Sequence, residues 1–453
     1  MRRLLHRALR SVSALDHWLR ERLTAAGWLV DGAAGAAAAA GLNTNQTVTY
    51  RAFAFLGVLI ALAWIASWLF RARVEASREL PRYATAGEPY RYRVTLINRS
   101  SHALSGATLG EQFRDPRPTL EEWRRAREPG EERRNWFDRN VGYFRWRWLI
   151  EQRLPGEAEH AALPALARGE RASVRLGFTP RRRGRIELAG LIMARTDPLG
   201  LVRGLARVPL PARVIALPRR YRLPEIRLPG KRRFQPGGVS LAASVGDSEE
   251  FLALRDYRPG DPLQRVHWKS FARTGKPVVK EYQDEFFERH ALVLDTGTAR
   301  GEDAAFEDAV ALAASFVYTI DTHECLLDLL FVGGALPEGP MIRAYTAGRG
   351  QMQAEHMLEV LAGVAASAPD EFSALARAVL ARRAQLSSLI LLLVSWDPAR
   401  RELVAALRAS GAELRVLLVT PPDRAPPELP PGVHVLHPGE IEKGLAGLKP
   451  CPA

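Results

Sequence analysis

The sequence predicts an α/β protein in which a doubly wound parallel sheet follows a transmembrane helical hairpin and a small antiparallel β-sandwich. Strand-like apolar runs alternate with helical patterns between residues 292 and 436, which is typical of a parallel sheet with helices on both faces. Apolar and polar residues alternate between residues 74 and 217, as in half-buried strands. Two apolar segments, 25–42 and 52–70, precede both regions and predict the hairpin.

The bulk composition suits a folded chain of two or three domains, with 453 residues, 47% hydrophobic and 25% charged. The two cysteines, Cys325 and Cys451, are too few for a disulfide framework or a zinc site. The net charge of +14 indicates an anionic partner, either nucleic acid or a membrane surface. We favour the membrane, because much of the arginine lies near the apolar segments or in the middle region.

The N-terminal segment, residues 1–24, is basic with interspersed leucines, which is typical of either an amphipathic interfacial helix or a cytoplasmic tail. Residues 25–72 form the predicted hairpin. Its second arm, 52–70, is 19 residues long without a charge and carries two tryptophans towards one end, as membrane anchors do. The first arm is rich in alanine and contains Asp31, so the sequence leaves its insertion open.

The charges that flank the hairpin predict its orientation. Arginines precede the first arm and follow the second, whereas the connection, residues 43–50, has no charge. The positive-inside rule then places both ends in the cytoplasm, so we expect a multi-pass protein of the inner (cytoplasmic) membrane with cytoplasmic soluble domains. A signal peptide is a poor alternative, because the apolar run is too long and too far from the start.

The β-sandwich is expected over residues 73–217, interrupted by a polar insertion at 114–168. Its strands show apolar residues at every second position, as at Tyr90, Tyr92, Val94 and Leu96.

The insertion contains an aromatic pattern of its own, in which Phe144, Trp146, Trp148 and Ile150 alternate with charged residues. Such a pattern is typical of an edge strand, of a surface against the bilayer, or of a site for single-stranded nucleic acid. No recognisable nucleic-acid motif accompanies it, which disfavours nucleic acid.

A Pro- and Arg-rich linker, residues 218–245, leads to the last region, 246–448. The predicted strands of this region are 292–294, 326–332, 389–394, 414–419 and 433–436. The predicted helices are 306–317, 355–366, 371–383 with Asp370 as its cap, and 399–408. A short tail, 449–453, follows.

The stretch from Gly246 to Asp295 holds the strongest local signals. Asp261-Pro262 predicts a helix start and Gly275 its end. Leu263, Val266, Ser270 and Phe271 would share one face of that helix, and Val278 begins an extended segment. The apolar run 291–294 is a short buried strand that delivers Asp295 at its carboxyl end, where open α/β sheets hold ligands.

This stretch resembles a known family. The residues that carry the likeness are Arg255, Tyr257, Pro259, Gly260 and Asp261, then Val266-His267-Trp268-Lys269 and Ala272-Arg273, supported by 180–185 and 196–201. They look like the signature of the domain of unknown function 58 family. The resemblance implies a membrane-tethered protein with a von Willebrand factor type A-like domain, and it implies a MoxR-type AAA+ ATPase as partner.

Type A domains commonly bind a divalent cation, so the resemblance also implies a metal site. The family pattern is Asp-x-Ser-x-Ser, and here both serines are replaced in Asp295-Thr296-Gly297-Thr298-Ala299. We therefore expect no cofactor beyond weakly bound Mg²⁺ at a degenerate site of Asp295, Thr298 and Asp397. The alternative is that Asp295 is a cap or turn residue at the end of a strand.

The signature residues allow two interpretations each. His267, beside Trp268, is either part of a functional pair or a packing residue. The charges of Arg255, Asp256, Asp261 and Lys269 form either an ion-pair network or a surface that a partner recognises.

Enzyme motifs are missing from the sequence: there is no Walker-type phosphate loop, no Gly-x-Ser-x-Gly and no His-Glu-x-x-His. We expect a non-enzymatic, membrane-anchored adaptor or assembly factor whose type A-like domain binds other proteins. The alternatives are a metal-dependent hydrolase that uses Asp295 and Asp397, and a nucleic-acid-binding protein.

Overall fold

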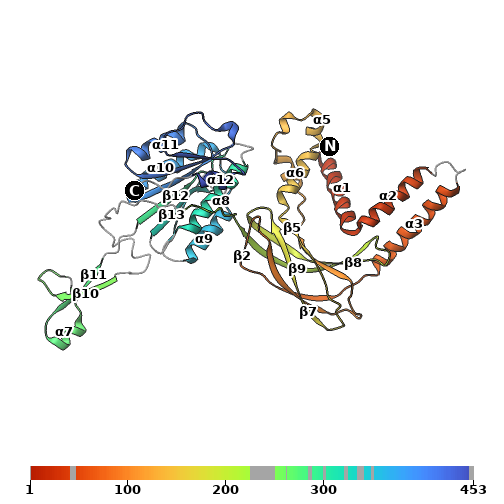
Figure 1. Ribbon diagram of the computed structural model, residues 1–453, viewed down its shortest axis with the longest axis horizontal. Helices are drawn as coiled ribbons and strands as arrows, with labels where there is room; N and C mark the ends of the chain where they lie inside the picture. Colours follow the sequence, from red (N-terminus) through yellow and green to blue (C-terminus); the bar gives the residue numbers. More distant parts are fainter. Residues whose placement is uncertain are drawn as a thin grey trace. The chain divides into compact units, whose positions relative to one another are not determined.

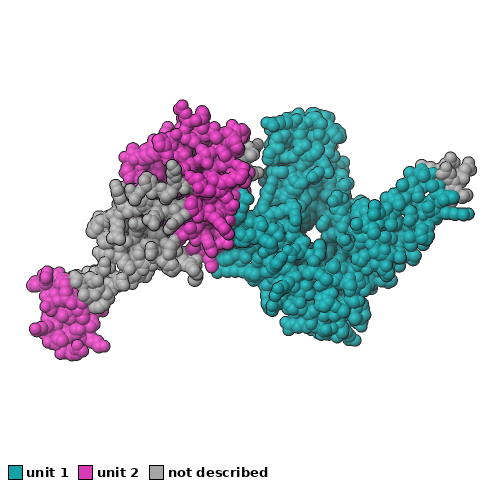
Figure 2. Space-filling model, viewed as in Figure 1, with its two compact units in different colours: residues 1–219 teal, residues 220–453 magenta. Residues whose placement is uncertain are grey.

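The computed structural model describes residues 2–40, 47–224, 250–261, 263–283, 288–298, 303–320, 325–333, 341–347 and 351–447. The chain divides into two compact units, residues 1–219 and 220–453 (Figure 2). Most of the expected linker and the expected tail, 449–453, lie outside the described residues.

Three helices begin the first unit: α1 (Arg2–Arg22), α2 (Ala25–Ala40) and α3 (Thr47–Trp68) (Figure 1). Within the described residues, α3 alone is long and apolar enough to cross a membrane, over Val48–Trp68. Helix α2 packs against α3 but has only 16 residues and includes Asp31. The structure therefore supports one candidate span near the N-terminus, where the sequence predicted a hairpin of two.

One face of helix α1 packs against the polar insertion, residues 114–168. The His6 ring is buried, lies 3.2 Å by its Nε2 from the Pro118 carbonyl oxygen, and contacts the rings of Trp123 and Trp146. Leu5 packs against the same tryptophan cluster. The segment is thus a helix held by tertiary contacts, with other apolar side chains such as Val12 exposed to solvent.

The junction between α1 and α2 rests on the turn that contains the upstream motif 196–201. The Asp197 carboxylate accepts the backbone N–H groups of Leu199, Leu201 and Val202, which fixes this turn. The Thr24 hydroxyl then donates to the Gly200 carbonyl oxygen at 2.7 Å. This motif therefore has a structural task, because it seats the N-terminal helices on the sandwich.

Two sheets form the β-sandwich. The four-stranded sheet has the order β1-β3-β7-β5, and the five-stranded sheet has the order β2-β9-β8-β4-β6. The strands are β1 (Val74–Glu79), β2 (Tyr83–Thr85), β3 (Tyr90–Asn98), β4 (Ala107–Phe113), β5 (Gly156–Ala158), β6 (His160–Ala162), β7 (Arg171–Pro180), β8 (Gly184–Thr196) and β9 (Arg203–Leu217). All pairs are antiparallel except β2 with β9, which is parallel and departs from the prediction.

The alternation predicted for this region is confirmed, since Tyr90, Tyr92, Val94 and Leu96 of β3 are all buried between the sheets. A charged group shares this core: Arg78 lies 2.8 Å from Glu111, whose other oxygen accepts the Tyr92 hydroxyl. The pairing offsets the cost of burying both charges.

The aromatic pattern of the insertion lies on a helix, so the edge strand, one of the three interpretations of this pattern, is wrong. Helices α4 (Leu120–Arg125), α5 (Trp136–Val141) and α6 (Tyr143–Arg153) make up this part. Trp146 and Leu149, three residues apart, face inward and pack with Trp123. Trp146, Leu149 and Ile150 have the i, i+3 and i+4 spacing of one helix face, and they pack with Trp123 in the structure. The motif proposed for nucleic acid is therefore not an extended platform.

The second unit contains a six-stranded sheet with the order β14-β13-β12-β15-β16-β17 (Figure 1). Its strands are β12 (Glu288–Leu294), β13 (Cys325–Gly333), β14 (Met341–Ala347), β15 (Ser388–Leu393), β16 (Glu413–Val419) and β17 (Val433–Leu436). The pairs are parallel except β13 with β14. The five predicted strands are confirmed, and the antiparallel edge strand β14 was not predicted.

Helices cover both faces of this sheet. Helices α10 (Phe372–Arg382) and α11 (Pro398–Ala409) pack on one face, in a core with Val293, Leu391 and Leu418. Helix α8 (Asp303–Thr319) packs against β12, β15 and β16, and α9 (Gln351–Ala362) lies beside α8. Helix α12 (Ile441–Ala446) follows β17. The second unit is thus a mixed α/β layer structure.

Helix α10 begins after a 3₁₀ turn at Pro369–Glu371, so Asp370 is not its cap.

A separate two-stranded antiparallel sheet precedes the six-stranded one. It pairs β10 (Glu250–Asp256) with β11 (Val278–Gln283). A 3₁₀ turn (Leu263–Arg265) and helix α7 (Trp268–Thr274) connect the two strands. We call residues 254–280 the signature hairpin.

Candidate functional site

The first candidate site lies at the carboxyl end of β12. Four buried apolar residues, 291–294, place β12 in the middle of the sheet and deliver Asp295 beside the end of β15, as predicted. The Asp295 backbone N–H donates to the Leu392 carbonyl oxygen at 2.9 Å. The side chain of Asp295 is fully buried, so its charge needs partners within the protein.

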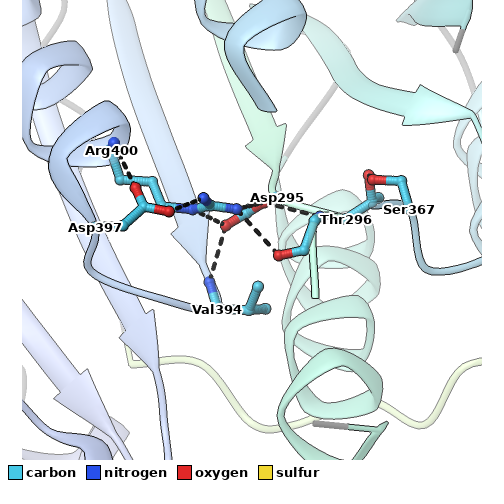
Figure 3. Close-up of polar contacts among 7 residues, drawn as sticks. Asp295, Thr296, Ser367, Val394, Asp397 and Arg400 are labelled. Atoms are coloured by element: carbon cyan, nitrogen blue, oxygen red, sulfur yellow. Dashed lines mark hydrogen bonds and ion pairs between the residues drawn. The ribbon is translucent and has the colours of Figure 1, made fainter. Parts of the chain in front are cut away.

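Arg400 supplies the main partner (Figure 3). Its Nε and Nη2 donate to the two carboxylate oxygens of Asp295, each at 2.8 Å, in a bidentate pair whose side chains are both fully buried. Nη2 also donates to the Gly297 carbonyl oxygen at 3.0 Å. The guanidinium carbon lies 4.2 Å from the centre of the Phe372 ring, which covers it.

Asp397 joins the same guanidinium and also caps α11. Its carboxylate accepts the Arg400 backbone N–H at 3.0 Å and forms an ion pair with Nη1. Pro398 occupies the first turn, as helix starts of this kind favour. The two carboxylates expected at the site are therefore brought together, with the Arg400 side chain between them.

Protonation of the pair follows from these contacts. Burial raises the pKa of the Asp295 carboxyl, and hydrogen bonds from Arg400, Val394 and Gly297 act to lower it. Burial acts to lower the pKa of the Arg400 guanidinium, but the hydrogen bond and charge of Asp295 hold it above its ordinary value. Because both Asp295 oxygens receive N–H donors only, this geometry holds the ionised carboxylate.

Thr298, the third expected ligand, does not join this cluster. Its backbone N–H donates to the Ser367 carbonyl oxygen at 3.2 Å. The neighbouring Thr296 hydroxyl donates to the Val332 carbonyl oxygen at 3.1 Å and lies 3.0 Å from the Ser367 hydroxyl. These contacts hold the loop after β12 to the segment before α10.

The residues present do not fit a divalent cation. The Arg400 guanidinium donates to both oxygens of Asp295 and to one oxygen of Asp397, so a positive charge already lies between the two carboxylates where a cation would bind. A Cβ at Gly297, where the metal-binding pattern has serine, would lie 2.8 Å from the Arg400 Nη2. Serine at this position would therefore crowd the Arg400 side chain and force one of the two to shift. Within the described ranges, no group of three or more His, Cys, Asp or Glu could hold a metal.

Sequence reasoning missed Arg400. Its partner Asp295 lies 105 residues earlier, and no local pattern reports such a contact. Two signals were available: Gly297 in place of serine, and an arginine in the first turn after the Asp397-Pro398 helix start.

The second candidate site is the signature hairpin, where a second bidentate pair lies near the surface. Arg255 donates to the two oxygens of Asp261 at 2.7 and 2.6 Å, and the Arg258 backbone N–H donates to the same carboxylate at 2.8 Å. These hydrogen bonds lower the pKa of Asp261 from 3.8 to about 2. The prediction that Asp261 starts a helix is wrong, because its carboxylate binds Arg255 instead. Pro262 lies outside the described residues.

His267, not Asp261, is the residue before α7. Its Nδ1 lies 2.6 Å from the Ser270 hydroxyl, and its backbone N–H donates to the Val278 carbonyl oxygen at 2.9 Å. Gly275 ends α7 with φ of 69°, as predicted. The half-buried His267 thus holds the hairpin together, which agrees with its interpretation as a packing residue.

The other signature residues shape or line the hairpin. The Tyr257 backbone N–H donates to the Pro277 carbonyl oxygen at 3.0 Å. Gly260 has φ of 109°, a backbone conformation that other residues rarely adopt. Trp268 and Lys269 are exposed. The four residues expected on one helical face are split between the 3₁₀ turn, the bridge from Val266 to Val279 and α7.

Comparison with known proteins relates this unit to an uncharacterised family. Residues 253–443 match the family described as "Protein of unknown function DUF58". A stretch of 152 residues is 27% identical to "Uncharacterized protein YeaD" of Bacillus subtilis (strain 168), and it covers 33% of this chain and 36% of the relative. The chain thus spans about a third of the length of that curated relative.

Solved structures give no further guidance. A CARDB domain of the PF1109 protein from Pyrococcus furiosus has a TM-score of 0.17 and 10% identity, over 32% of this chain and 89% of that one. A GH20 exo-β-N-acetylglucosaminidase from Vibrio harveyi has a TM-score of 0.15 and 10% identity, over 77% of this chain and 57% of that one. Scores this low carry no argument about fold or function.

Proposed function

We propose that this protein is a membrane-anchored, non-enzymatic adaptor whose type A-like α/β unit binds another protein. The observation that carries the proposal is the closed cluster of Asp295, Arg400 and Asp397. In an α/β sheet the carboxyl ends of the strands are the usual place for reactive groups. Here Asp295 and Asp397 both bind the buried Arg400, which disfavours their use as a free base or as metal ligands.

The membrane part of the proposal rests on α3. Most residues of its 21-residue apolar stretch, Val48–Trp68, are not buried in the structure, so its side chains suit a lipid environment. Helix α2 packs along α3, and arginines border both ends of the pair. This charge pattern favours a two-helix hairpin with both ends in the cytoplasm of the cell, which would place the β-sandwich and the second unit there.

The partner that we propose is a MoxR-type AAA+ ATPase. This choice rests on the family resemblance of the signature hairpin alone, because no contact among the residues that the structure describes bears on it. A metal-dependent hydrolase is not proposed, because Asp295 and Asp397 both bind Arg400. A nucleic-acid function is not proposed either, because Trp146 of the aromatic pattern is buried in a helical cluster.

The proposal is tested by crosslinking and affinity purification of the tagged full-length chain from native membranes. An adaptor should enrich an AAA+ ATPase over a control membrane protein that carries the same tag. The purified chain should also show no hydrolase activity that depends on Mg²⁺ or Mn²⁺. Failure to enrich any AAA+ ATPase would remove the proposed partner, and a metal-dependent activity that Asp295→Asn abolishes would refute the non-enzymatic role.

A further inference from the structure

We propose that the signature hairpin docks on an anionic lipid surface, with Leu263, Trp268 and Phe271 at the bilayer interface and its basic side chains against the headgroups. The proposal goes beyond the adaptor function and does not depend on the identity of the protein partner. Three features of the hairpin carry it: exposed apolar side chains, a strong positive charge and a scaffold that holds both in place.

The hairpin exposes large apolar side chains within a short stretch. Trp268 is 59% exposed and Leu263 is 65% exposed. Phe271 is exposed too, and its ring meets that of Trp268 edge to face at 6.1 Å. Tryptophan with neighbouring Phe and Leu is the composition that settles at the boundary between headgroups and acyl chains, because one end of the indole is apolar and the other is polar.

The hairpin is basic, in contrast to the residues that follow it in the same unit. Residues 254–280 hold seven basic and two acidic side chains, for a net charge of +5. Residues 288–447 hold thirteen basic and twenty-one acidic side chains, for a net charge of −8. An anionic bilayer therefore attracts the hairpin and repels the rest of the unit, so the charge selects which part touches the surface.

A lipid surface fits this distribution because the chain is expected to be held at a bilayer by α3. Tethering makes docking intramolecular, so that modest attraction suffices. Each basic residue close to an anionic leaflet adds roughly a fivefold preference for the docked state.

The scaffold is built before docking. The bidentate pair between Arg255 and Asp261 closes one end of the connection, and the bridge from Val266 to Val279 attaches it to β11. The backbone hydrogen bond from His267 to Val278 fixes the start of α7. Because these contacts order the backbone already, docking needs little further loss of conformational entropy.

The test uses the full-length chain in nanodiscs, with an environment-sensitive NBD label on a cysteine at Ala272→Cys and with Cys325 and Cys451 replaced by alanine. One set of nanodiscs holds phosphatidylcholine alone, and the other holds a two-to-one mixture with phosphatidylglycerol. A second labelled chain carries Ser373→Cys on the exposed side of α10 as a reference position. No ATPase is present, so failure here is separate from failure of the proposed adaptor function.

We expect a blue shift and protection from aqueous quencher at position 272 only in the anionic nanodiscs, with no change at position 373. Lys269→Glu with Arg273→Glu should lower the ratio of docked to undocked chains by about thirtyfold or more. Loss of two basic residues, at roughly fivefold each, accounts for this order of magnitude. Trp268→Ser with Phe271→Ser should also abolish the shift. The matched control, Arg377→Glu with Arg401→Glu on exposed positions of α10 and α11, should leave it unchanged.

Three results would overturn the proposal. The label could shift equally in both lipids, which would remove the role of charge. It could be shielded already in phosphatidylcholine without responding to the Glu variants, which would mean that the hairpin packs on the protein itself. The label could stay exposed to the quencher in both lipids while circular dichroism shows that the labelled chain is folded. The hairpin would then not bind lipid, and its exposed surface would be left for a protein partner.

Discussion

Two bidentate Arg–Asp pairs in this chain have the same chemistry and opposite surroundings. The side chains of Arg400 and Asp295 are both fully buried, whereas those of Arg255 and Asp261 are 35% and 15% exposed. The buried pair engages Asp295, the acidic residue at the carboxyl end of β12. The pair in the hairpin shapes a turn that displays other side chains. The two pairs have the same geometry, so their burial decides their role: the buried pair leaves its charged groups inaccessible, whereas the pair near the surface holds a turn whose other side chains are exposed.

The energetic difference follows from solvation. A buried charge that loses its partner is left in a medium that solvates it poorly, so breaking the pair costs several kcal/mol. A charge near the surface regains water when its partner is removed, and salt screens it as well. The two pairs should therefore respond very differently to the same substitutions.

The largest effect should come from Arg400→Ala or Asp295→Ala. Arg400→Ala leaves the buried Asp295 carboxylate without a charged partner, and Asp295→Ala leaves the buried Arg400 guanidinium with Asp397 as its remaining ion-pair partner. We expect the free energy of unfolding to fall by about 3–5 kcal/mol, more for Arg400→Ala than for Asp295→Ala. Chemical denaturation monitored by circular dichroism measures the change. The matched control is Arg401→Ala, one residue along α11 and exposed, which should stay within about 0.5 kcal/mol of the wild type. Equal effects of Arg400→Ala and Arg401→Ala would contradict the closed site.

A smaller effect is expected for Gly297→Ser, which restores one serine of the metal-binding pattern. Its Cβ would lie 2.8 Å from the Arg400 Nη2, so we expect a loss of about 1–3 kcal/mol from overpacking. The same substitution in the Arg400→Ala background should cost much less, because the crowding atom is gone. A double-mutant cycle measures this coupling, and additive losses would show that Gly297 and Arg400 do not compete for space.

The smallest effect should come from Asp261→Asn in the hairpin. We expect faster amide hydrogen exchange over 255–280 with no change in the six-stranded sheet, because the substitution loosens one turn. The neighbouring Asp256→Asn, at an exposed position, is the control and should leave exchange as it is. Slower or unchanged exchange in Asp261→Asn would show that the pair does not hold the turn.

Acid should loosen the same turn. The pKa of Asp261 in the folded protein, about 2, lies below its ordinary value of 3.8. A lowered folded-state pKa contributes stability that is complete above the ordinary value and is lost as pH falls through the folded value. Hydrogen exchange of the hairpin should therefore stay constant down to about pH 4 and rise from there towards about pH 2, once corrected for intrinsic exchange rates. An exchange rate that rises already near neutral pH would contradict the role of Asp261.

The sequence predicted most strands of the second unit and the position of Asp295, because continuous apolar runs can lie only inside a sheet that is covered on both faces. It failed where two local interpretations competed. Asp261-Pro262 has the composition of a helix start, but the carboxylate of Asp261 binds the guanidinium of Arg255. The alternating residues of α6 suit a strand, but Trp146, Leu149 and Ile150 also share one face of a helix, and that face packs on Trp123. The pairing of Arg400 with Asp295 joins residues 105 positions apart and depends on the folded sheet, so the local signals at Gly297 and after Pro398 do not identify the partner by themselves.

Arg400 occupies the carboxyl end of β12, and we therefore expect that no divalent cation binds there. Calorimetric titration of Mg²⁺ and Mn²⁺ into the purified full-length chain tests it most directly, with the melting temperature followed in metal and in EDTA. We predict no saturable binding to the wild type and the same melting temperature in both conditions. Saturable binding at millimolar metal that Asp295→Asn removes, with a melting temperature that falls in EDTA, would contradict the account.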